Sequence, residues 1–377
     1  MERRHFLKQA ALGTAGSTAL LGCGSDPSGE VNGAPAVQTG RRLRWRLVSS
    51  FPRSAEIIFR GAEVLAERVS ALTGGQFEII VSPAGEIVPP FQVLDAVQNR
   101  SVQMGHTASY YFTGKNPALA FDTGVPFGMT VRQQNAWMLD GDGTELTRSL
   151  FADFGVVNLL GGNTGTQMGG WFRRPVGSLA DMRGLKMRIP GLGAQVMDRM
   201  GVNALSLPGG EIYQALERGA IDATEWIGPY DDEKLGFQRV VQHYYYPGWW
   251  EPGAVLSFYV NQAEWDGLPE VYRQILEVAA LEVNQRMMAE YDAKNPPALQ
   301  RLINGGVQLH PFPDDVMQAA RVAARALSEE AAAADAGYRA LYDSYRQFQQ
   351  ASDRWFATAE QAYSDFAFAH TAEASAS

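Results

Sequence analysis

Three polar residues lie in otherwise apolar stretches, where their side chains could bind a ligand. Gln167, in "GTQMGG", is either a satisfied core amide or an oxygen donor that points into a cleft. Arg188, in "KMRIP", is either an ion-pair residue or, if it is buried at a strand end, a bidentate partner for a carboxylate. Glu225, at the end of "IDATE", is either half of a structural ion pair or a ligand-binding carboxylate. These residue types are suited to binding a carboxylate, a cation or both.

Aromatic residues are concentrated in segment 243–254, "HYYYPGWWEPGA". Aromatic side chains at this density are typical of a concave site or an interface. Glu251, among them, is either a hydrogen-bonded anchor or a metal ligand. Because Gln167, Glu225 and Glu251 offer oxygen atoms and no imidazole or thiolate, they would suit a hard cation such as sodium or calcium.

The sequence gives little support for a catalytic site or for a nucleotide-binding site. The five histidines are not spaced as in a zinc site, and no G-x-S-x-G nucleophile motif occurs. The glycine-rich segment 161–170 contains no lysine, and "GLGAQV" at 191–196 lacks the third glycine of a dinucleotide fingerprint. The net charge of −9 argues against binding to nucleic acid or to anionic lipid. We therefore expect a ligand-binding protein and not an enzyme.

The N-terminal residues have the features of an export signal. Arg3 and Arg4 resemble a twin-arginine motif, and the apolar run that follows is too short to span a membrane. The run ends at Cys23, the single cysteine, in a sequence that resembles a bacterial lipobox. A sole cysteine is often a buried small side chain, but this position favours lipidation. We expect a signal peptide over residues 1–22, then a flexible Gly-, Pro- and Ser-rich tether over 23–40.

The remaining sequence predicts an α/β fold. Strand and helix patterns alternate from Leu43 onward and again from about Leu185, which indicates two βαβ-containing units with parallel strands. Segments 153–162 and 255–261 have the extended character of crossovers between the units. From Asp314 to about His370 the sequence favours helix and carries many aromatic residues. These helices either pack on their own chain or mediate a dimer.

Several of these motifs resemble one protein family. "GNTGTQMGGWFR", "LKMRIPGLG", "LPGGEIYQALERGAIDATEW" and "YYYPGWWEPGA" are similar to the solute receptors of TRAP transporters, the DctP family, and to its α-keto-acid-binding (TakP) subgroup. The resemblance implies a two-lobed, clam-shell fold of the periplasmic-binding-protein type. The expected divisions are lobe I over 41–160, lobe II over 161–256, a return to lobe I over 257–313, and C-terminal helices over 314–377.

The same resemblance implies roles for individual residues. Arg188 would clamp the carboxylate of the ligand. A cation would be held by Gln167, Glu225, the Trp226 carbonyl and, as a further ligand, Glu251. We favour sodium, but calcium accepts the same set of oxygen ligands. Tyr110 or Tyr111, together with Asn163, would lie near the cleft and hydrogen-bond the ligand. The ligand contacts would also include Gln167 and Trp226.

One residue departs from the family pattern. Trp250 stands where the family leads us to expect a smaller polar or imidazole side chain, which would make the cleft tighter or more aromatic. The subgroup also dimerises through exchanged C-terminal helices, so a homodimer is expected.

The resulting hypothesis is a periplasmic, lipid-anchored receptor that passes a 2-oxo or 2-hydroxy carboxylate to a TRAP permease. Such an acid would chelate the cation through a carboxylate oxygen and its neighbouring oxygen, while arginine binds the other carboxylate edge. Two alternatives remain open: a sensory module for a membrane kinase, and an enzyme acting on keto acids with Glu225 as its base.

Overall fold

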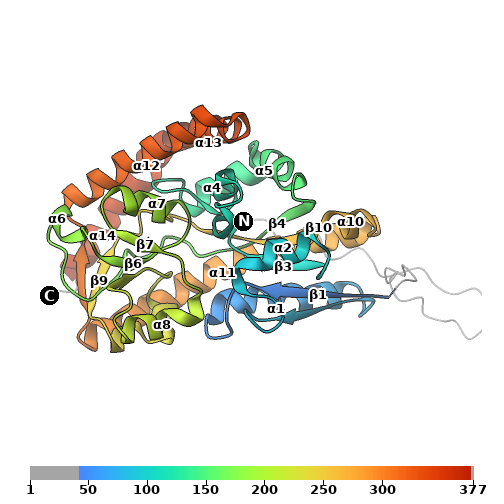
Figure 1. The fold of residues 1–377 in the computed structure, drawn as a ribbon, viewed down its shortest axis with the longest axis horizontal. Coiled ribbons are helices and arrows are strands. Elements are labelled where there is room, and N and C mark those ends of the chain that lie inside the picture. Colours follow the sequence, from blue (N-terminus) through green and yellow to red (C-terminus); the bar gives the residue numbers. More distant parts are fainter. Residues whose placement is uncertain (1–41, 375–377) are drawn as a thin grey trace, which may run out of the picture. The chain divides into compact units, whose positions relative to one another are not determined.

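The computed structural model describes residues 42–374, which form two β-sheets surrounded by helices (Figure 1). The predicted signal peptide over 1–22, the tether over 23–40 and Cys23 lie outside the described residues. The two-sheet α/β architecture predicted from the alternation of strand and helix patterns is confirmed. No helix in residues 42–374 is long and apolar enough to span a membrane.

The first sheet has five strands in the order β2-β1-β3-β10-β4. These are β1 (Leu43–Ser49), β2 (Phe77–Ser82), β3 (Met104–Thr107), β4 (Val156–Asn163) and β10 (Val255–Asn261). Strand β1 pairs in parallel with β2 and β3, whereas β10 pairs antiparallel with β3 and β4. Strands β4 and β10 occupy the two segments predicted as crossovers, and all residues of both strands are buried.

The second sheet has six strands in the order β11-β9-β5-β8-β6-β7. These are β5 (Gly170–Phe172), β6 (Lys186–Arg188), β7 (Asn203–Leu205), β8 (Ala223–Thr224), β9 (His243–Tyr246) and β11 (Gln308–Pro311). Strands β6, β7 and β8 are parallel, so their carboxyl ends meet at one edge, where ligands bind in α/β sheets. The segment 257–313, predicted to return to lobe I, is divided, because β11 joins the second sheet.

Glycines at the start of this sheet allow close contact between backbones. Gly170 has φ +89°, and a Cβ there would collide with the carbonyl oxygen of Thr224 on the neighbouring strand. An L side chain would be strained at this φ as well as obstructed. At Gly170, close packing against the neighbouring strand explains the glycine, and phosphate binding does not.

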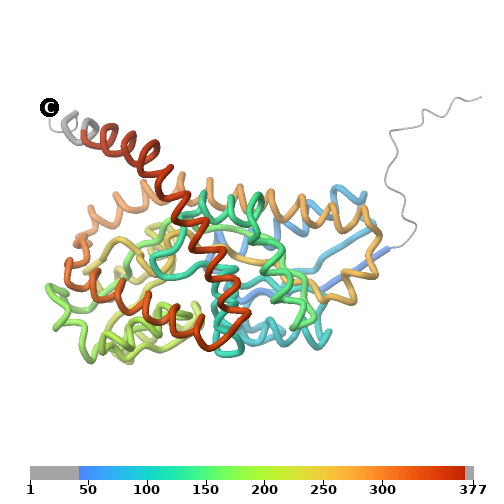
Figure 2. The backbone as a smooth tube through the Cα atoms, turned by 90° about the horizontal axis from the view of Figure 1, so that it is seen from above, coloured from blue at the N-terminus to red at the C-terminus, as the bar shows by residue number. Residues whose placement is uncertain are grey.

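Helices pack around both sheets. The short and medium helices are α1 (Glu56–Leu72), α2 (Val93–Gln98), α3 (Ala120–Thr123), α4 (Val131–Asp140), α5 (Gly143–Ala152), α6 (Leu179–Met182), α7 (Gly191–Arg199), α8 (Gly209–Glu217), α9 (Pro229–Leu235) and α10 (Gln262–Asp266). Helix α11 (Glu270–Asn304) has 35 residues, about 50 Å at the usual rise. It contacts α1 and β4 beside the first sheet and α9 beside the second, and Figure 2 shows it running along much of the molecule.

The C-terminal region forms three successive helices. These are α12 (Asp314–Ala334), α13 (Ala336–Phe356) and, after a π-helical turn over Ala357–Gln361, α14 (Ala362–Ala374). The break at Asp335 caps α13, whose Tyr338 amide donates to the Asp335 carboxylate. Buried Tyr345 fixes α13 to the body by accepting a hydrogen bond of 2.7 Å from the Met129 amide. Beyond α13 the chain projects away from the sheets (Figure 2).

Candidate functional site

The centre of the site is a buried ion pair between adjacent strands. Arg188 ends β6 and Glu225 follows β8, and the parallel register places Arg188 opposite Thr224. Both side chains are 1% exposed, and Nη1 of Arg188 donates to Oε1 of Glu225. Nε donates to the carbonyl of Leu207 at 3.0 Å. Among the described residues, Nη2 of Arg188 has no hydrogen-bond partner, so this end of the guanidinium can donate to a ligand oxygen.

Trp226 packs directly against this pair. Its ring lies 5.2 Å from the Arg188 guanidinium carbon, in cation-π geometry. The indole fits there because residue 209 is glycine, whose missing Cβ leaves room for the ring. Within residues 42–374, neither the indole N–H nor the backbone carbonyl of Trp226 has a hydrogen-bond partner. Both groups remain available to a ligand or a cation.

Gln167 and Glu251 are brought to the same place by two loops. The amide of Gly248 donates to the carbonyl of Gln167 at 2.9 Å, which joins the loop after β4 to the loop after β9. Nε2 of Gln167 donates to Thr164 at 3.1 Å, while its Oε1 is buried and has no partner in the described part of the chain. Oε2 of Glu251 is likewise buried and has no hydrogen-bond partner in the described part of the chain. Two oxygen atoms therefore lie buried without donors.

Burial controls the charge of the two carboxyl groups. It raises the pKa of Glu225 to about 7, against the opposing effect of the Arg188 guanidinium. Burial also raises the pKa of Glu251 well above its ordinary value, and the nearby charge of Glu225 adds to this effect. The positive charge of one guanidinium, that of Arg188, therefore acts on two carboxyl groups. A cation bound beside them would relieve their repulsion, because an opposite charge favours the ionised forms.

The expected ligand-contacting residues reach the site from the first sheet. Tyr110 and Tyr111 lie in a 3-10 turn, η2 (Ser109–Phe112), after β3. Burial, and then the Glu251 charge, raises the pKa of Tyr110 well above its ordinary value, so its hydroxyl stays protonated and can donate. Asn163 ends β4 and is buried. Its Oδ1 accepts from the Gly165 amide at 2.8 Å, and its Nδ2 finds no partner among the described residues.

The two sheets approach each other closely at Tyr110. Gly191, at the start of α7, has φ +63°, and a Cβ built on it would lie 2.9 Å from the Cβ of Tyr110. Both the backbone conformation and the available space therefore require glycine there. This contact sets the distance between η2 and the Arg188 strand.

A third buried carboxyl group, that of Asp232, supports the site from behind. Asp232 accepts hydrogen bonds from Nε1 of Trp171 at 2.9 Å and from the Tyr244 hydroxyl at 2.6 Å. It also accepts from the Ile227 amide at 3.3 Å, which fixes the turn that follows Trp226. The sequence analysis missed Asp232. The signal available was its place in "WIGPYDD", two acidic residues at the start of a helix that follows an apolar strand.

Helix α11 supports the same turn. The Tyr291 hydroxyl donates to Asp231 at 2.5 Å, and Oδ1 of Asn295 accepts from the Tyr230 amide at 3.1 Å. The helix that lies along the first sheet thus also holds the residues after Trp226. Because these bonds are made deep in the fold, they fix the turn independently of any ligand.

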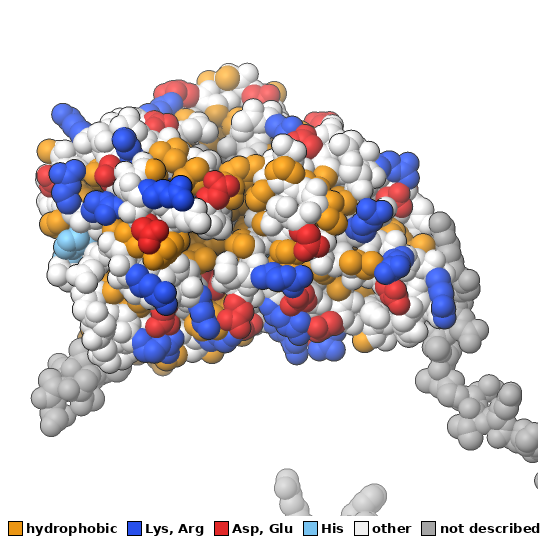
Figure 3. Space-filling model, turned by 60° about the horizontal axis from the view of Figure 1, so that its bottom comes forward, with side chains coloured by type: hydrophobic (Ala, Val, Ile, Leu, Met, Phe, Trp, Pro, Cys, Tyr) orange, Lys and Arg blue, Asp and Glu red, His pale blue; other side chains and the backbone are white. Residues whose placement is uncertain are grey.

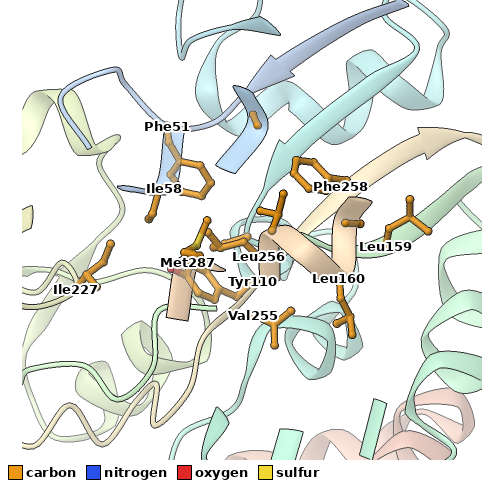
Figure 4. Close-up of a cluster of buried hydrophobic side chains, with 14 of the residues drawn as sticks. Phe51, Ile58, Tyr110, Leu159, Leu160, Ile227, Val255, Leu256, Phe258 and Met287 are labelled. Carbon is orange, nitrogen blue, oxygen red and sulfur yellow. The ribbon is translucent and has the colours of Figure 1, made fainter. Parts of the chain in front are cut away.

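A cavity of only about 10 Å³, about the room of one water molecule, lies at the site. Tyr110, Tyr111, Gln167 and Trp226 line its polar side. Its apolar side consists of residues that the sequence did not single out, because isolated apolar residues carry no signal of function. They are Phe51, Ile58, Ile227, Ala254 and Leu256, and Figure 4 shows Phe51 and Ile58, Ile227, and Leu256 approaching from separate parts of the chain.

Two features of the described residues differ from the expectations. Trp250 does not line this cavity but packs with Trp249 and Phe312 in the core of the second sheet. The aromatic segment 243–254 is likewise mainly core, with Tyr244 stacked on Trp171 at 4.0 Å. A larger cavity, of about 790 Å³, lies between α12, α13 and the 125–130 loop. We place the site at the small cavity because Gln167 and Trp226, which line it, have polar atoms without partners among the described residues. The charges of Arg188, Glu225 and Glu251 also act on Tyr110 and Tyr111 in its wall.

The oxygen donors fit a hard cation. Residues 42–374 contain no cluster of three or more His, Cys, Asp or Glu side chains suited to a metal. A cation at this site would therefore rely on a mixed set of carboxylate, amide and carbonyl oxygens, which is the donor type that sodium and calcium accept. The unpartnered Oε1 of Gln167 and Oε2 of Glu251 meet that requirement.

Comparison with known proteins identifies the family. The family of bacterial extracellular solute-binding proteins known as family 7, or DctP, matches residues 48–335. The chain belongs to the DctP family. A DctP relative, the monocarboxylate 2-oxoacid-binding periplasmic protein of Nostoc sp. strain PCC 7120, is 49% identical over 97% of this chain and 99% of its own.

Two solved structures of TRAP transporter solute-binding proteins resemble this DctP protein closely. The protein from Bordetella bronchiseptica, a dimer with calcium and picolinate in one active site, is 45% identical, with a TM-score of 0.87 over 89% of this chain and 99% of its own. The protein from Pseudoalteromonas atlantica, with bound sodium and pyruvate, is 37% identical, with a TM-score of 0.84 over 86% and 99%. The fold of this DctP protein is thus that of TRAP solute receptors.

The Arg188–Glu225 pair yields a prediction about stability. Arg188→Met leaves Glu225 buried without its cationic partner and should lower the free energy of unfolding by about 3–5 kcal/mol. Adding Glu225→Gln should recover part of this loss, because no unpaired charge then remains. Urea unfolding of the two variants measures both effects, with the exposed Arg183→Met as the control. A single variant as stable as the unmodified protein would contradict the energetic role of the pair.

Proposed function

We propose that this protein captures a small 2-oxo or 2-hydroxy carboxylate together with a metal cation and delivers it to the membrane permease of a TRAP transporter. One observation carries the proposal: a free guanidinium nitrogen of Arg188 shares a small buried site with two donor-free oxygens, Gln167 Oε1 and Glu251 Oε2. An anion bound to the guanidinium nitrogen and a cation bound to the two oxygens would give all three atoms a partner. The pyruvate and sodium bound by the Pseudoalteromonas protein support it.

Each residue has a proposed role. Nη2 of Arg188 binds one carboxylate edge of the ligand. Gln167, Glu225 and the Trp226 carbonyl hold the cation, and Glu251 is its further ligand. The hydroxyls of Tyr110 and Tyr111 and the amide of Asn163 donate hydrogen bonds to the ligand oxygens.

The cation explains why a second oxygen on the ligand matters. A 2-oxo acid offers its carboxylate and keto oxygens to one cation in a five-membered chelate, whereas a simple carboxylate leaves one cation position unfilled. Polar groups left unpaired in a buried site reject a ligand strongly. The small cavity with Phe51, Ile58 and Leu256 on its apolar side favours a short, apolar remainder on the acid.

Calorimetry on metal-stripped protein tests this function. Pyruvate should bind when sodium or calcium is supplied and not in their absence, and propionate, which lacks the keto oxygen, should bind at least about 100-fold more weakly. Arg188→Lys should weaken pyruvate binding by about tenfold or more, since an ammonium ion lacks the planar fork. If no 2-oxo or 2-hydroxy acid binds under any cation condition, the proposal is wrong.

We favour sodium as the resident cation, and the charge balance is the reason. If Glu251 stays protonated, as its raised pKa favours, the charges of Glu225, Arg188, sodium and a carboxylate ligand sum to zero. If Glu251 is ionised, calcium gives the neutral sum instead. A buried site with a net charge is costly, so the protonation of Glu251 sets the preferred ion.

A variant of Glu251 tests this balance. Glu251→Gln fixes the side chain as neutral and should retain pyruvate binding in sodium while weakening it in calcium by about tenfold or more. Glu225→Gln is the matched control and should weaken binding with either cation, with partial recovery at high cation concentration. Equal loss in sodium and calcium for Glu251→Gln would count against the charge argument.

We also propose that the two sheets belong to two lobes, over about 41–160 and 161–256, and that two copies associate through the C-terminal helices. Trp355, Tyr363 and Phe368 on the helical segment 336–374 are 62%, 73% and 72% exposed, more than isolated surface residues require. The related Bordetella protein is a dimer. Tyr363→Glu together with Phe368→Glu should convert a dimer into a monomer in sedimentation velocity. A dimer that persists would place the interface elsewhere.

Location outside the cytoplasm follows from membership of an extracellular solute-binding family. We propose periplasmic delivery through a twin-arginine-type signal over residues 1–22 and a lipid anchor on Cys23. Mass spectrometry of the mature N-terminal peptide is the direct check: a mature chain that does not begin with diacylated Cys23 would refute the anchor.

A further inference from the structure

Two histidines meet at the edge of the second sheet. His243 opens β9 and His310 lies in β11, the outermost strand of that sheet. The parallel register pairs His243 with Gln308 and His310 with Tyr245, so both histidines project from the same face. Nδ1 of His243 lies 3.1 Å from Nε2 of His310.

The two rings are held in place by the fold. His310 stacks on Tyr245 with ring centroids 5.0 Å apart. Tyr245 is itself buried and fixed, because its hydroxyl accepts from the Val176 amide at 2.7 Å and donates to the Val176 carbonyl at 3.1 Å. The His310 ring therefore rests on an immobile support, which reduces the entropy lost when a ligand is bound.

The pair remains accessible to solvent. Both side chains are half-buried, whereas His106 is fully buried. Histidine atoms are visible at the margin of the face drawn in Figure 3. Burial and the adjacent His243 lower the pKa of His310.

We propose that His243 and His310 form a binding site for a borderline divalent transition metal such as Cu²⁺, Ni²⁺ or Zn²⁺, separate from the oxygen site for the hard cation. Imidazole nitrogens lie about 2.0–2.1 Å from such metals. Two nitrogens 3.1 Å apart then subtend an angle of about 100° at the metal, close to the cis angles of square-planar and tetrahedral coordination.

Binding requires a shift of tautomer and a rotation of the rings that directs both lone pairs at the metal. In the metal-free pair one ring donates its N–H to the other. When each ring carries its proton on the outer nitrogen, both facing nitrogens present lone pairs to the metal and no net proton is released. The described residues supply no third His, Cys, Asp or Glu ligand, so water completes the coordination.

This site differs in chemistry from the ligand site. The latter offers carboxylate, amide and carbonyl oxygens, whereas the edge pair offers two imidazoles. Hard cations such as sodium and calcium therefore prefer the oxygen atoms of the ligand site, whereas a transition metal prefers the two imidazoles of the edge pair. The inference does not depend on the proposed ligand function.

Metal titration of the full chain, made without a polyhistidine tag, tests this site. Excess sodium and calcium are present throughout to occupy hard-cation sites. Cu²⁺ and Zn²⁺ should each bind at one site, Cu²⁺ more tightly. His243→Gln and His310→Gln should each weaken binding by about tenfold or more, and Gln308→Ala, on the same strand edge, should not.

Electron paramagnetic resonance of the Cu²⁺ complex gives a second readout. The unmodified protein should show coupling to two imidazole nitrogens, and each single variant to fewer. Thermal melting confirms that the glutamine variants fold. Absence of Cu²⁺ binding to the unmodified protein, or equal affinity in the folded variants, would overturn the proposal.

Discussion

The structure depends on placing two carboxyl groups and one guanidinium in a buried space. Removing an ionised carboxylate from water costs several kcal/mol unless a partner replaces the lost hydration. Arg188 forms an ion pair with Glu225, whereas the pKa of Glu251 remains above its ordinary value. The protein therefore has a deficit of hydrogen-bond donors at one place. The cation and ligand that we propose would make up this deficit.

The rest of the fold keeps this arrangement from relaxing. If the loops could move outward, Glu251 would reach water and the deficit would vanish. Asp232 fixes the turn after Trp226, and Tyr291 on α11 holds the neighbouring Asp231. Gly191 permits η2 to approach the Arg188 strand. These contacts hold buried charged groups in an arrangement that costs free energy, as is common at functional sites.

The sequence predicted the architecture and the polar centre of the site for identifiable reasons. The alternation of strands and helices is local, and it located the two sheets. Arg188 and Glu225 were conspicuous because charged residues stood in apolar strands, although their mutual pairing depends on β6 and β8 being neighbours, which no local pattern shows. The roles expected for Tyr110, Tyr111 and Asn163 came from family resemblance and stay predictions. The apolar wall, Asp232 and the core position of Trp250 could not be predicted, because they depend on contacts between distant segments.

Helix α11 links parts of the molecule that the sheets leave separate. It packs on α1 and β4 at one end, and through Tyr291 and Asn295 it also holds the turn that carries Trp226. The helix is about 50 Å long, and its two internal prolines, Pro296 and Pro297, follow the residues that hold this turn. The packing of α1 and the position of the turn after Trp226 therefore depend on one helix, so a substitution in α11 that shifts it on α1 would also reach the turn.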